Sequence, residues 1–143
     1  MLSQPKQPMH SNFLALDVGR ARIGIAIANS IARIAAPLPA IVNDENHITT
    51  IQDLVAENDI ATLVVGWPRG LNGQHTEQTE YVDAFVEKLE TGIQIPIVKQ
   101  DEALTSVQAE AELKRRGKDF AKGDIDSLSA VYILEDYLAE GVH

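Results

Sequence analysis

Three acidic residues, Asp17, Glu102 and Asp126, stand at positions where a carboxylate could do chemistry. Asp17 ends a predicted strand, Glu102 follows another, and Asp126 lies in the first turn of a predicted helix. Carboxylates that converge repel one another, so such a group needs bound protons or a cation. Oxygen-only ligation suits Mg²⁺ or Mn²⁺. A pair of such ions can activate water and stabilise the leaving oxygen during phosphodiester cleavage.

Each acid also has an ordinary structural explanation. Asp close to Gly19 is a common turn formula, and negative charge near a helix start is favoured by the helix dipole. From the residues alone, both explanations stay open. Other metal chemistry has less support, because the chain has no cysteine to supply thiolate ligands. Its histidines, at positions 10, 47, 75 and 143, show no ligand spacing.

Composition fixes the scale of the protein but not its partner. The chain has 143 residues, 45% of them hydrophobic, which suits one domain with one compact interior. A net charge of −9 argues against a protein that coats nucleic acid by neutralising phosphates. Cations nevertheless crowd together at Lys114, Arg115, Arg116, Lys118 and Lys122. This run fits either a nucleic-acid contact or a solvated helix end, so the charge neither supports nor excludes a polyanionic substrate.

The ends of the chain and its hydropathy predict a cytoplasmic protein. The opening residues MLSQPKQPMHSN lack the apolar segment of a secretory signal. No stretch approaches the roughly 20 apolar residues that a membrane-spanning helix needs. We therefore expect a flexible tail over residues 1–12 and a single domain over residues 13–140.

Apolar runs predict five strands. Residues 13–18 and 23–28 flank a short turn and read as a hairpin. Pro37 and Pro39 restrict a third extended segment, 33–41, to a sheet edge, because proline cannot donate to a ladder. Residues 60–66 lack alternation, as expected of a parallel strand covered on both faces. The remaining strand is predicted at positions 93–98.

Helices are predicted from capping residues and apolar periodicity. Asp44 is expected to cap a helix over 46–58, Thr76 a second, and Asp124 a last one reaching about residue 139. Thr105 and Gln108 match a capping box for another helix ending near Gly117, followed by a mobile segment to residue 123. The resulting order, β-β-β-α-β-α-β-α-α, predicts an α/β fold with a five-stranded mixed sheet flanked by helices.

Four ordered blocks carry a resemblance to a known family. They are LALDVGRARIGIAIAN (14–29), VVGWPRGLNGQHTEQT (64–79), DEALTSVQAE (101–110) and KGDIDSLSAVYILEDYL (122–138). Together they span nearly everything after the tail. In this order they closely resemble the YqgF/RuvX family, whose members are described as candidate Holliday-junction resolvases and pre-16S rRNA nucleases. The resemblance implies an RNase H-like fold.

The resemblance also implies roles for individual residues. It makes Asp17, Glu102 and Asp126 the catalytic and metal-binding acids, with Mg²⁺ or Mn²⁺ as cofactor. Substrate-binding roles are implied for Arg22, Thr105 and Lys122. Arg22 could pair with a phosphate or with one of the acids, or it could be a surface residue of the hairpin.

Two positions near these blocks raise questions of their own. Ala103 stands where the family usually has arginine, which removes a possible phosphate or carboxylate partner. Trp67 could stack on a base, or it could lie at an exposed edge of the core.

Several functions are compatible with this sequence. We expect first a metal-dependent endonuclease that processes the 5′ end of pre-16S rRNA during ribosome biogenesis. It would act on precursor rRNA or ribosomal particles, as a monomer or homodimer. A Holliday-junction resolvase acting on branched DNA is the main alternative substrate assignment. A catalytically silent module that binds nucleic acid or ribosomes is a second, motivated by Ala103 and the acidic composition. Nucleotide binding of the actin-like kind ranks last, because the chain is too short for two lobes.

Overall fold

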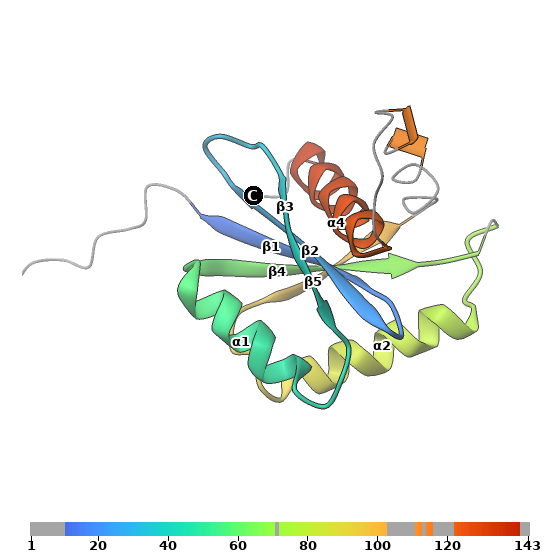
Figure 1. Ribbon diagram of the computed structural model, residues 1–143. Coiled ribbons are helices and arrows are strands. Elements are labelled where there is room, and N and C mark those ends of the chain that lie inside the picture. The colour runs from blue at the N-terminus through green and yellow to red at the C-terminus, as the bar shows by residue number, and fades with distance from the viewer. Residues whose placement is uncertain (1–10, 71, 103–110, 113, 116–121, 141–143) are drawn as a thin grey trace, which may run out of the picture.

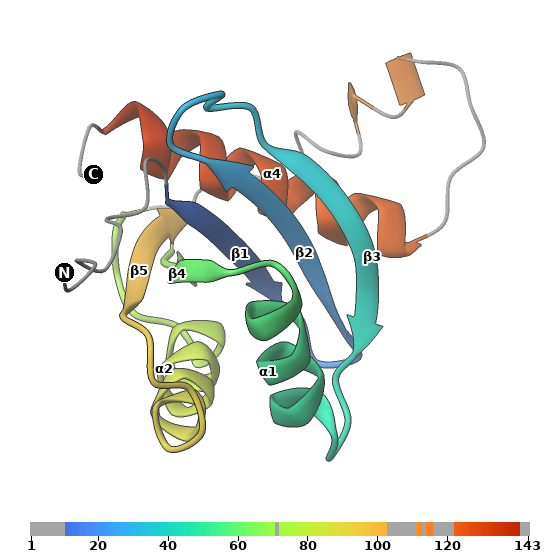
Figure 2. The same ribbon diagram turned by 90° about the vertical axis from the view of Figure 1, so that its left-hand side faces the viewer.

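A computed structural model describes residues 11–70, 72–102, 111–112, 114–115 and 122–140, and of Lys122 only the backbone. Its centre is a five-stranded sheet with the order β3-β2-β1-β4-β5. Helices α1 and α2 cover one face of this sheet and α4 covers the other (Figure 1). The turned view shows the same three layers from the side (Figure 2). The predicted α/β fold with a five-stranded sheet between helices is confirmed.

The sheet is mixed, as predicted. β1 (Asn12–Val18) and β2 (Arg22–Asn29) form an antiparallel hairpin. β3 (Ala36–Val42) pairs antiparallel with β2 at the edge of the sheet, which confirms the position predicted from its two prolines. β4 (Ile60–Pro68) lies parallel to β1, and β5 (Ile97–Glu102) lies parallel to β4. The carboxyl ends of β1, β4 and β5 therefore point to the same side of the molecule.

Three helices are described along most of their length: α1 (His47–Glu57), α2 (Glu77–Glu90) and α4 (Lys122–Ala139). Thr76 caps α2 as predicted, in a reciprocal capping box with Thr79. The helix predicted from Thr105 begins outside the described residues, although 111–112 and 114–115 are helical. Within the described part of the chain, no helix has the length and apolarity needed to cross a membrane.

Two apolar clusters lie on opposite faces of the sheet. The larger one joins β1, β2 and β4 to α1 and α2 through Leu14, Leu16, Ile51, Leu63, Phe85 and Leu89. The smaller one joins the sheet to α4 through Phe13, Ala15, Ala26, Ile133, Leu134 and Tyr137. Side chains alternate along a strand, so Asp17 follows Ala15 onto the α4 face. Small side chains such as Ala15 and Ala26 let this helix pack closely on the sheet.

The predicted fifth strand was placed too early. β5 covers Ile97–Glu102 instead of 93–98, because Pro96 offers no N–H and only its carbonyl is bonded, to the amide of Leu63 (2.9 Å). Ile93 instead fills the core from the turn before the strand. Pairing with β4 then continues through polar residues until Glu102 lies opposite Pro68. Glu102 is therefore the last residue of a strand, not the residue after it.

The predicted starts of two helices were also wrong. Asn46, not Asp44, is the N-cap of α1, and it makes no side-chain cap bond. The Asp44 carboxylate accepts the Asn46 N–H (2.9 Å), so it closes an Asx turn before the helix. α4 begins at Lys122, which places Asp124 inside the first turn and includes the last two residues of the segment expected to be mobile. The rest of that segment lies outside the described residues.

β3 begins three residues later than predicted. Arg33, the predicted first residue, has a φ of 54°. This left-handed conformation is incompatible with an extended strand. Pairing with β2 therefore starts at Ala36, opposite Ile27.

Candidate carboxylate site

Asp17 and Glu102 meet at the carboxyl end of the parallel strands, on the face covered by α4. Burial raises the pKa of Asp17 well above its ordinary value, and the negative charge of Glu102 raises it further. A hydrogen bond between the two carboxyl groups and the charge of Asp126 act in the same direction. Two carboxyl groups in hydrogen-bond contact cannot both ionise without compensation. The pair therefore holds a proton or accepts a cation.

Ser129 opposes this rise in the pKa of Asp17. Its hydroxyl, on α4, is fully buried and donates a hydrogen bond to the Asp17 carboxylate, which favours the ionised form. We did not identify Ser129 from the sequence as part of this site. The periodicity of α4 turns Ser129 toward the sheet, but a serine in that position fits core packing equally well.

Two glycines make room for the acids. Gly24 pairs with Asp17 across the hairpin, and a side chain on Gly24 would overlap the backbone carbonyl of Asp126. On β4, a Cβ at Gly66 would lie 2.8 Å from Oε2 of Glu102. Sequence reasoning gave Gly24 no role, although a lone glycine inside an apolar strand indicates a close backbone approach.

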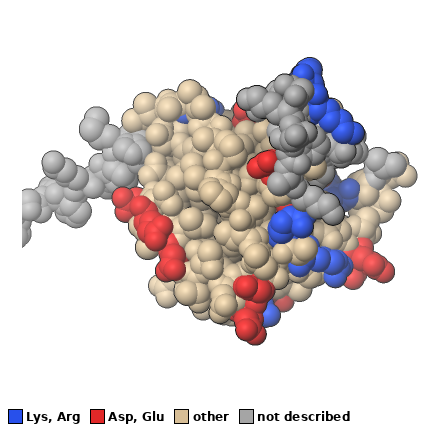
Figure 3. Space-filling model, in the orientation of Figure 1, with Lys and Arg blue, Asp and Glu red and all other residues tan. Residues whose placement is uncertain are grey.

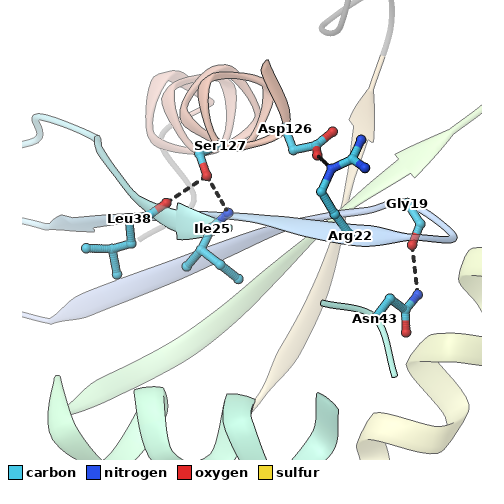
Figure 4. Close-up of polar contacts among 7 residues, drawn as sticks. All are labelled: Gly19, Arg22, Ile25, Leu38, Asn43, Asp126 and Ser127. Carbon is cyan, nitrogen blue, oxygen red and sulfur yellow. Dashed lines mark hydrogen bonds and ion pairs between the residues drawn. The ribbon is translucent and has the colours of Figure 1, made fainter. Parts of the chain in front are cut away.

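Ser127 fixes α4 over the sheet. Its Oγ donates to the carbonyl oxygen of Leu38 (2.7 Å) and accepts the N–H of Ile25 (3.4 Å) (Figure 4). The pairing of β2 with β3 shifts register next to Ile25, so the hydroxyl bridges the strands where their ladder is irregular. This contact also fixes the backbone of the preceding residue, Asp126.

Asp126 is paired with Arg22. The Nε of Arg22 donates to Oδ2 of Asp126 at 2.7 Å, as Figure 4 shows. The sequence had left two partners for Arg22 open, a phosphate or an acid, and here the partner is an acid. Arg22 begins β2 directly after a tight turn, in which the Gly19 N–H donates to the Arg22 carbonyl (2.9 Å). Asn43 holds this turn by donating to the Gly19 carbonyl (2.7 Å).

The structure therefore brings the three predicted acids into one neighbourhood but not into one ligand set. Asp17 and Glu102 are in contact, whereas Asp126 influences Asp17 through its charge and is bonded to Arg22. Among the residues that are described, no three His, Asp or Glu side chains are arranged to hold a metal ion. The donor chemistry nevertheless fits a hard cation, since oxygen ligands and unrelieved negative charge are what Mg²⁺ and Mn²⁺ require.

The remaining predicted residues are placed less completely. Thr105 and Ala103 lie outside the described residues, and Lys122 begins α4 with its side chain undescribed. Trp67 lies at the edge of the core, which was one of the two roles predicted for it. Its indole N–H donates to Asp83 (2.8 Å). Lys99 also bonds that carboxylate, and this bond is the largest cause of the lowered pKa of Asp83.

Basic groups are unevenly distributed on the surface. On the face seen in Figure 3, most of the Lys and Arg lie toward the right, where some Asp and Glu also lie, and a run of Asp and Glu occupies the left-hand edge. The β1–β2 turn lies on the right in this orientation (Figure 1). The net negative charge is therefore compatible with a locally basic surface near the carboxyl ends of the strands.

The fold defines an RNase H-like α/β protein, and solved structures agree. Thermus thermophilus RuvC, solved in complex with Holliday junction substrate, superposes with a TM-score of 0.54 at 13% identity, over 92% of this chain and 97% of that one. The fowlpox virus resolvase, solved with Holliday junction DNA, gives a TM-score of 0.56 at 8% identity, over 92% and 99% of the two chains. At such low identities, these likenesses show the fold alone.

Sequence relatives define the family. The sequence model of RuvX, described as a Holliday junction resolvase, matches residues 11–140. A "Putative pre-16S rRNA nuclease" of Sulfurihydrogenibium sp. is 42% identical over 90% of both chains. Another of that name, from Chloroflexus aurantiacus, is 43% identical over 87% of this chain and 84% of its own. The chain belongs to the RuvX family, which confirms the resemblance seen in the four sequence blocks.

Proposed function

We propose that this protein is a divalent-metal-dependent endonuclease that hydrolyses phosphodiester bonds in structured RNA. Its substrate would be the 5′ end of pre-16S rRNA, free or in ribosomal particles. The observation that carries the proposal is the contact between the Asp17 and Glu102 carboxyl groups, where burial and like charge leave a demand for a cation. The names of the sequence relatives support the choice of RNA.

Asp17, Glu102 and Asp126 would hold Mg²⁺ or Mn²⁺. When bound, the cation supplies a Lewis acid that lowers the pKa of water and neutralises charge on the phosphate. The chain's own groups prepare for it. Asp17 must release its proton to become a ligand, and the Ser129 hydroxyl favours the ionised carboxylate. The Arg22 guanidinium is suited to a phosphate oxygen, because its planar set of donors matches that geometry.

Thr105 and Lys122 would make further contacts with the substrate. Thr105 lies shortly after Glu102 in the sequence, and Lys122 lies shortly before Asp126. Residues 13–140 would form the nuclease domain, with residues 1–12 as a tail. A second candidate, resolution of branched DNA, has the family description and the DNA complexes of two structural neighbours in its favour.

One assay separates these functions. A labelled precursor RNA carrying the 16S leader and a four-way DNA junction are incubated with purified protein in Mg²⁺, Mn²⁺ or EDTA. We expect metal-dependent RNA cleavage that Asp17→Asn reduces by at least about 100-fold. This loss is larger than that caused by mutating a residue that only supports the metal ligands. Asp53→Asn is the matched control, because it removes an exposed carboxylate from α1, away from the site.

The other outcomes are equally informative. Cleavage of the junction but not the RNA would assign the protein to DNA. Binding without turnover, unchanged in Asp17→Asn, would make it a silent module. Undiminished cleavage by Asp17→Asn would remove the proposed mechanism.

A further inference from the structure

The Arg22–Asp126 ion pair joins the two halves of the candidate site. Arg22 comes from the start of β2 and Asp126 from the first turns of α4, more than 100 positions away in sequence. The bond engages the carboxylate that the three-acid arrangement needs as its third ligand. Within the described residues, the acids form no metal-holding group. The ion pair and a complete ligand set therefore compete for the same carboxylate.

We propose that Arg22 is a latch that substrate releases: it holds Asp126 until a nucleic-acid phosphate binds its guanidinium, and Asp126 then joins Asp17 and Glu102 around the cation. This inference rests on the proposed nuclease function and adds to it an order of events. Arg22 acts as a positioning residue for Asp126 before the substrate arrives. Its contact with the phosphate then replaces the contact that it made with the acid.

The exposure of the pair makes such an exchange feasible. The side chains of Arg22 and Asp126 are 38% and 22% exposed, so water and solutes reach both partners. Ion pairs of this kind are only weakly favourable. A phosphate offers arginine a stronger partner, because two parallel N–H···O bonds can form at once.

A groove leads the substrate to Arg22. It has a volume of about 630 Å³ and runs between β3 and the start of α4. Arg22 lines it together with apolar side chains that include Pro37, Leu38, Pro39 and Leu128. Its walls offer apolar surface to sugars and bases, and Arg22 offers the guanidinium for a phosphate. Asp124 also lines the groove, which disfavours phosphates away from Arg22.

The exchange requires only side-chain movement. The Asp126 backbone is fixed by its contact with Gly24 and by the bridge that Ser127 makes to β2 and β3. The backbone of Arg22 is fixed by the tight turn at Gly19. We therefore expect the exchange to proceed by rotation of these two side chains, with the backbone of β2 and α4 in place.

The latch predicts that nucleic acid and cation bind cooperatively through Arg22. Coupling between two ligands is reciprocal, so RNA must increase the affinity for the cation by the same factor as the cation increases the affinity for RNA. Mn²⁺ binding is measured by titration calorimetry, with and without a non-cleavable 2′-O-methyl RNA strand, for wild type and Arg22→Gln. Arg20→Gln is the matched control, because it removes the same charge from the same hairpin. Among the described residues, the Arg20 guanidinium packs on Tyr81 instead of an acid, 4.4 Å from the ring centroid.

Three results are expected. Without RNA, the affinity of Arg22→Gln for Mn²⁺ is higher than that of Arg20→Gln by a factor of at least about 5. With RNA, wild type and Arg20→Gln gain at least about 5-fold in Mn²⁺ affinity, the usual lower range of such coupling. Arg22→Gln loses most of that gain. Equal Mn²⁺ affinities for the two glutamine variants, or an undiminished gain from RNA in Arg22→Gln, would overturn the latch.

Two further variants separate the latch from the metal site itself. Asp17→Asn should weaken Mn²⁺ binding with and without RNA, whereas Asp126→Asn should weaken it chiefly with RNA, when the latch has released that carboxylate. If neither does, the proposed metal-dependent function fails, whatever Arg22 does. If both do and Arg22→Gln matches its control, only the latch fails. Circular dichroism melts confirm folding, and Arg22→Met, which removes the charge but keeps an unbranched side chain, repeats the test if Arg22→Gln does not fold.

Discussion

The backbone carbonyl of Asp126 lies directly over Gly24, the residue that pairs with Asp17 across the β1–β2 hairpin. One acid is thus carried by the strand beside this glycine, and another by the helix that rests on it. The absence of a single side chain at position 24 sets how closely the two acids approach. The site depends on this packing contact as much as on the acids themselves.

Gly24→Ala should therefore separate α4 from the sheet. The added methyl overlaps backbone, which cannot rotate away, so we expect a loss of about 1–3 kcal/mol in the free energy of unfolding. Metal-dependent cleavage should fall with it. Gly123→Ala is the control, because among the described residues its Cβ would meet only the Ala40 methyl at 3.4 Å. Urea unfolding of both variants checks the prediction, and equal stabilities would contradict it.

Gly66→Ala should damage the site more than the fold. Its Cβ would lie 2.8 Å from Oε2 of Glu102 and 2.5 Å from Cδ1 of Ile133. Both atoms end side chains that can shift, so we expect a stability loss of about 1 kcal/mol, smaller than for Gly24→Ala. The displaced carboxylate should weaken Mn²⁺ binding at least about 10-fold. Calorimetry well below the melting temperature measures this, and an unchanged affinity would show that Glu102 does not need its present position.

Asp17→Asn should stabilise the metal-free protein at neutral pH. The folded-state pKa of Asp17 is raised, so the stability that its protonated form contributes at low pH is lost as the pH rises through that pKa. Asparagine stays neutral and avoids this loss. A gain of about 1 kcal/mol corresponds to a few degrees in Tm.

Melts in EDTA at neutral pH and near pH 4 test this sign. The gap between Asp17→Asn and wild type should be present at neutral pH and close as the pH approaches the unfolded-state pKa of about 3.9. Added Mg²⁺ should stabilise wild type preferentially, because a ligand that binds the folded state raises its stability. A gap of equal size at both pH values would contradict the prediction.

Ser129→Ala should shift the pH dependence of activity toward higher pH. Its hydroxyl stabilises ionised Asp17, so its removal raises the pKa of that carboxyl further and delays its ionisation. Ser127→Ala is the control two positions away, since within the described part of the chain Ser127 bonds only backbone groups of β2 and β3. That variant should lower Tm without moving the pH–rate profile. Superimposable profiles for Ser129→Ala and wild type would rule out the role of this hydroxyl.

The central strands β1, β2 and β4 could be predicted from sequence because they are largely buried on both faces. Residues 60–66 form a continuous apolar run, and such runs identify interior strands with little help from context. The predicted position of β5 was too early because the second half of this strand, Lys99–Glu102, is polar. Backbone pairing with β4 and Pro96 define that strand, and neither is visible in a hydropathy pattern.

Contacts within the site were harder to predict than its residues. Their places at strand ends and a helix start made Asp17, Glu102 and Asp126 candidates, and the family resemblance joined them into one site. The Arg22–Asp126 bond, however, joins residues 104 positions apart, and its geometry depends on how α4 packs. Ser129 and Gly24 lacked any chemical signal, because buried serines and glycines serve packing in most proteins. Only the close approach of helix and strand gives these two residues their roles.

The contact of α4 with Gly24 also sets the order in which the candidate site is assembled during synthesis. Chains emerge from the ribosome with the amino end first and fold as units. Asp17 and Arg22 are made before the helix that carries Asp126 and Ser129. Its docking onto β2 closes contacts between the two ends of the sequence. A nascent chain from which α4 has not yet emerged thus lacks Asp126 and Ser129, and its candidate site is incomplete.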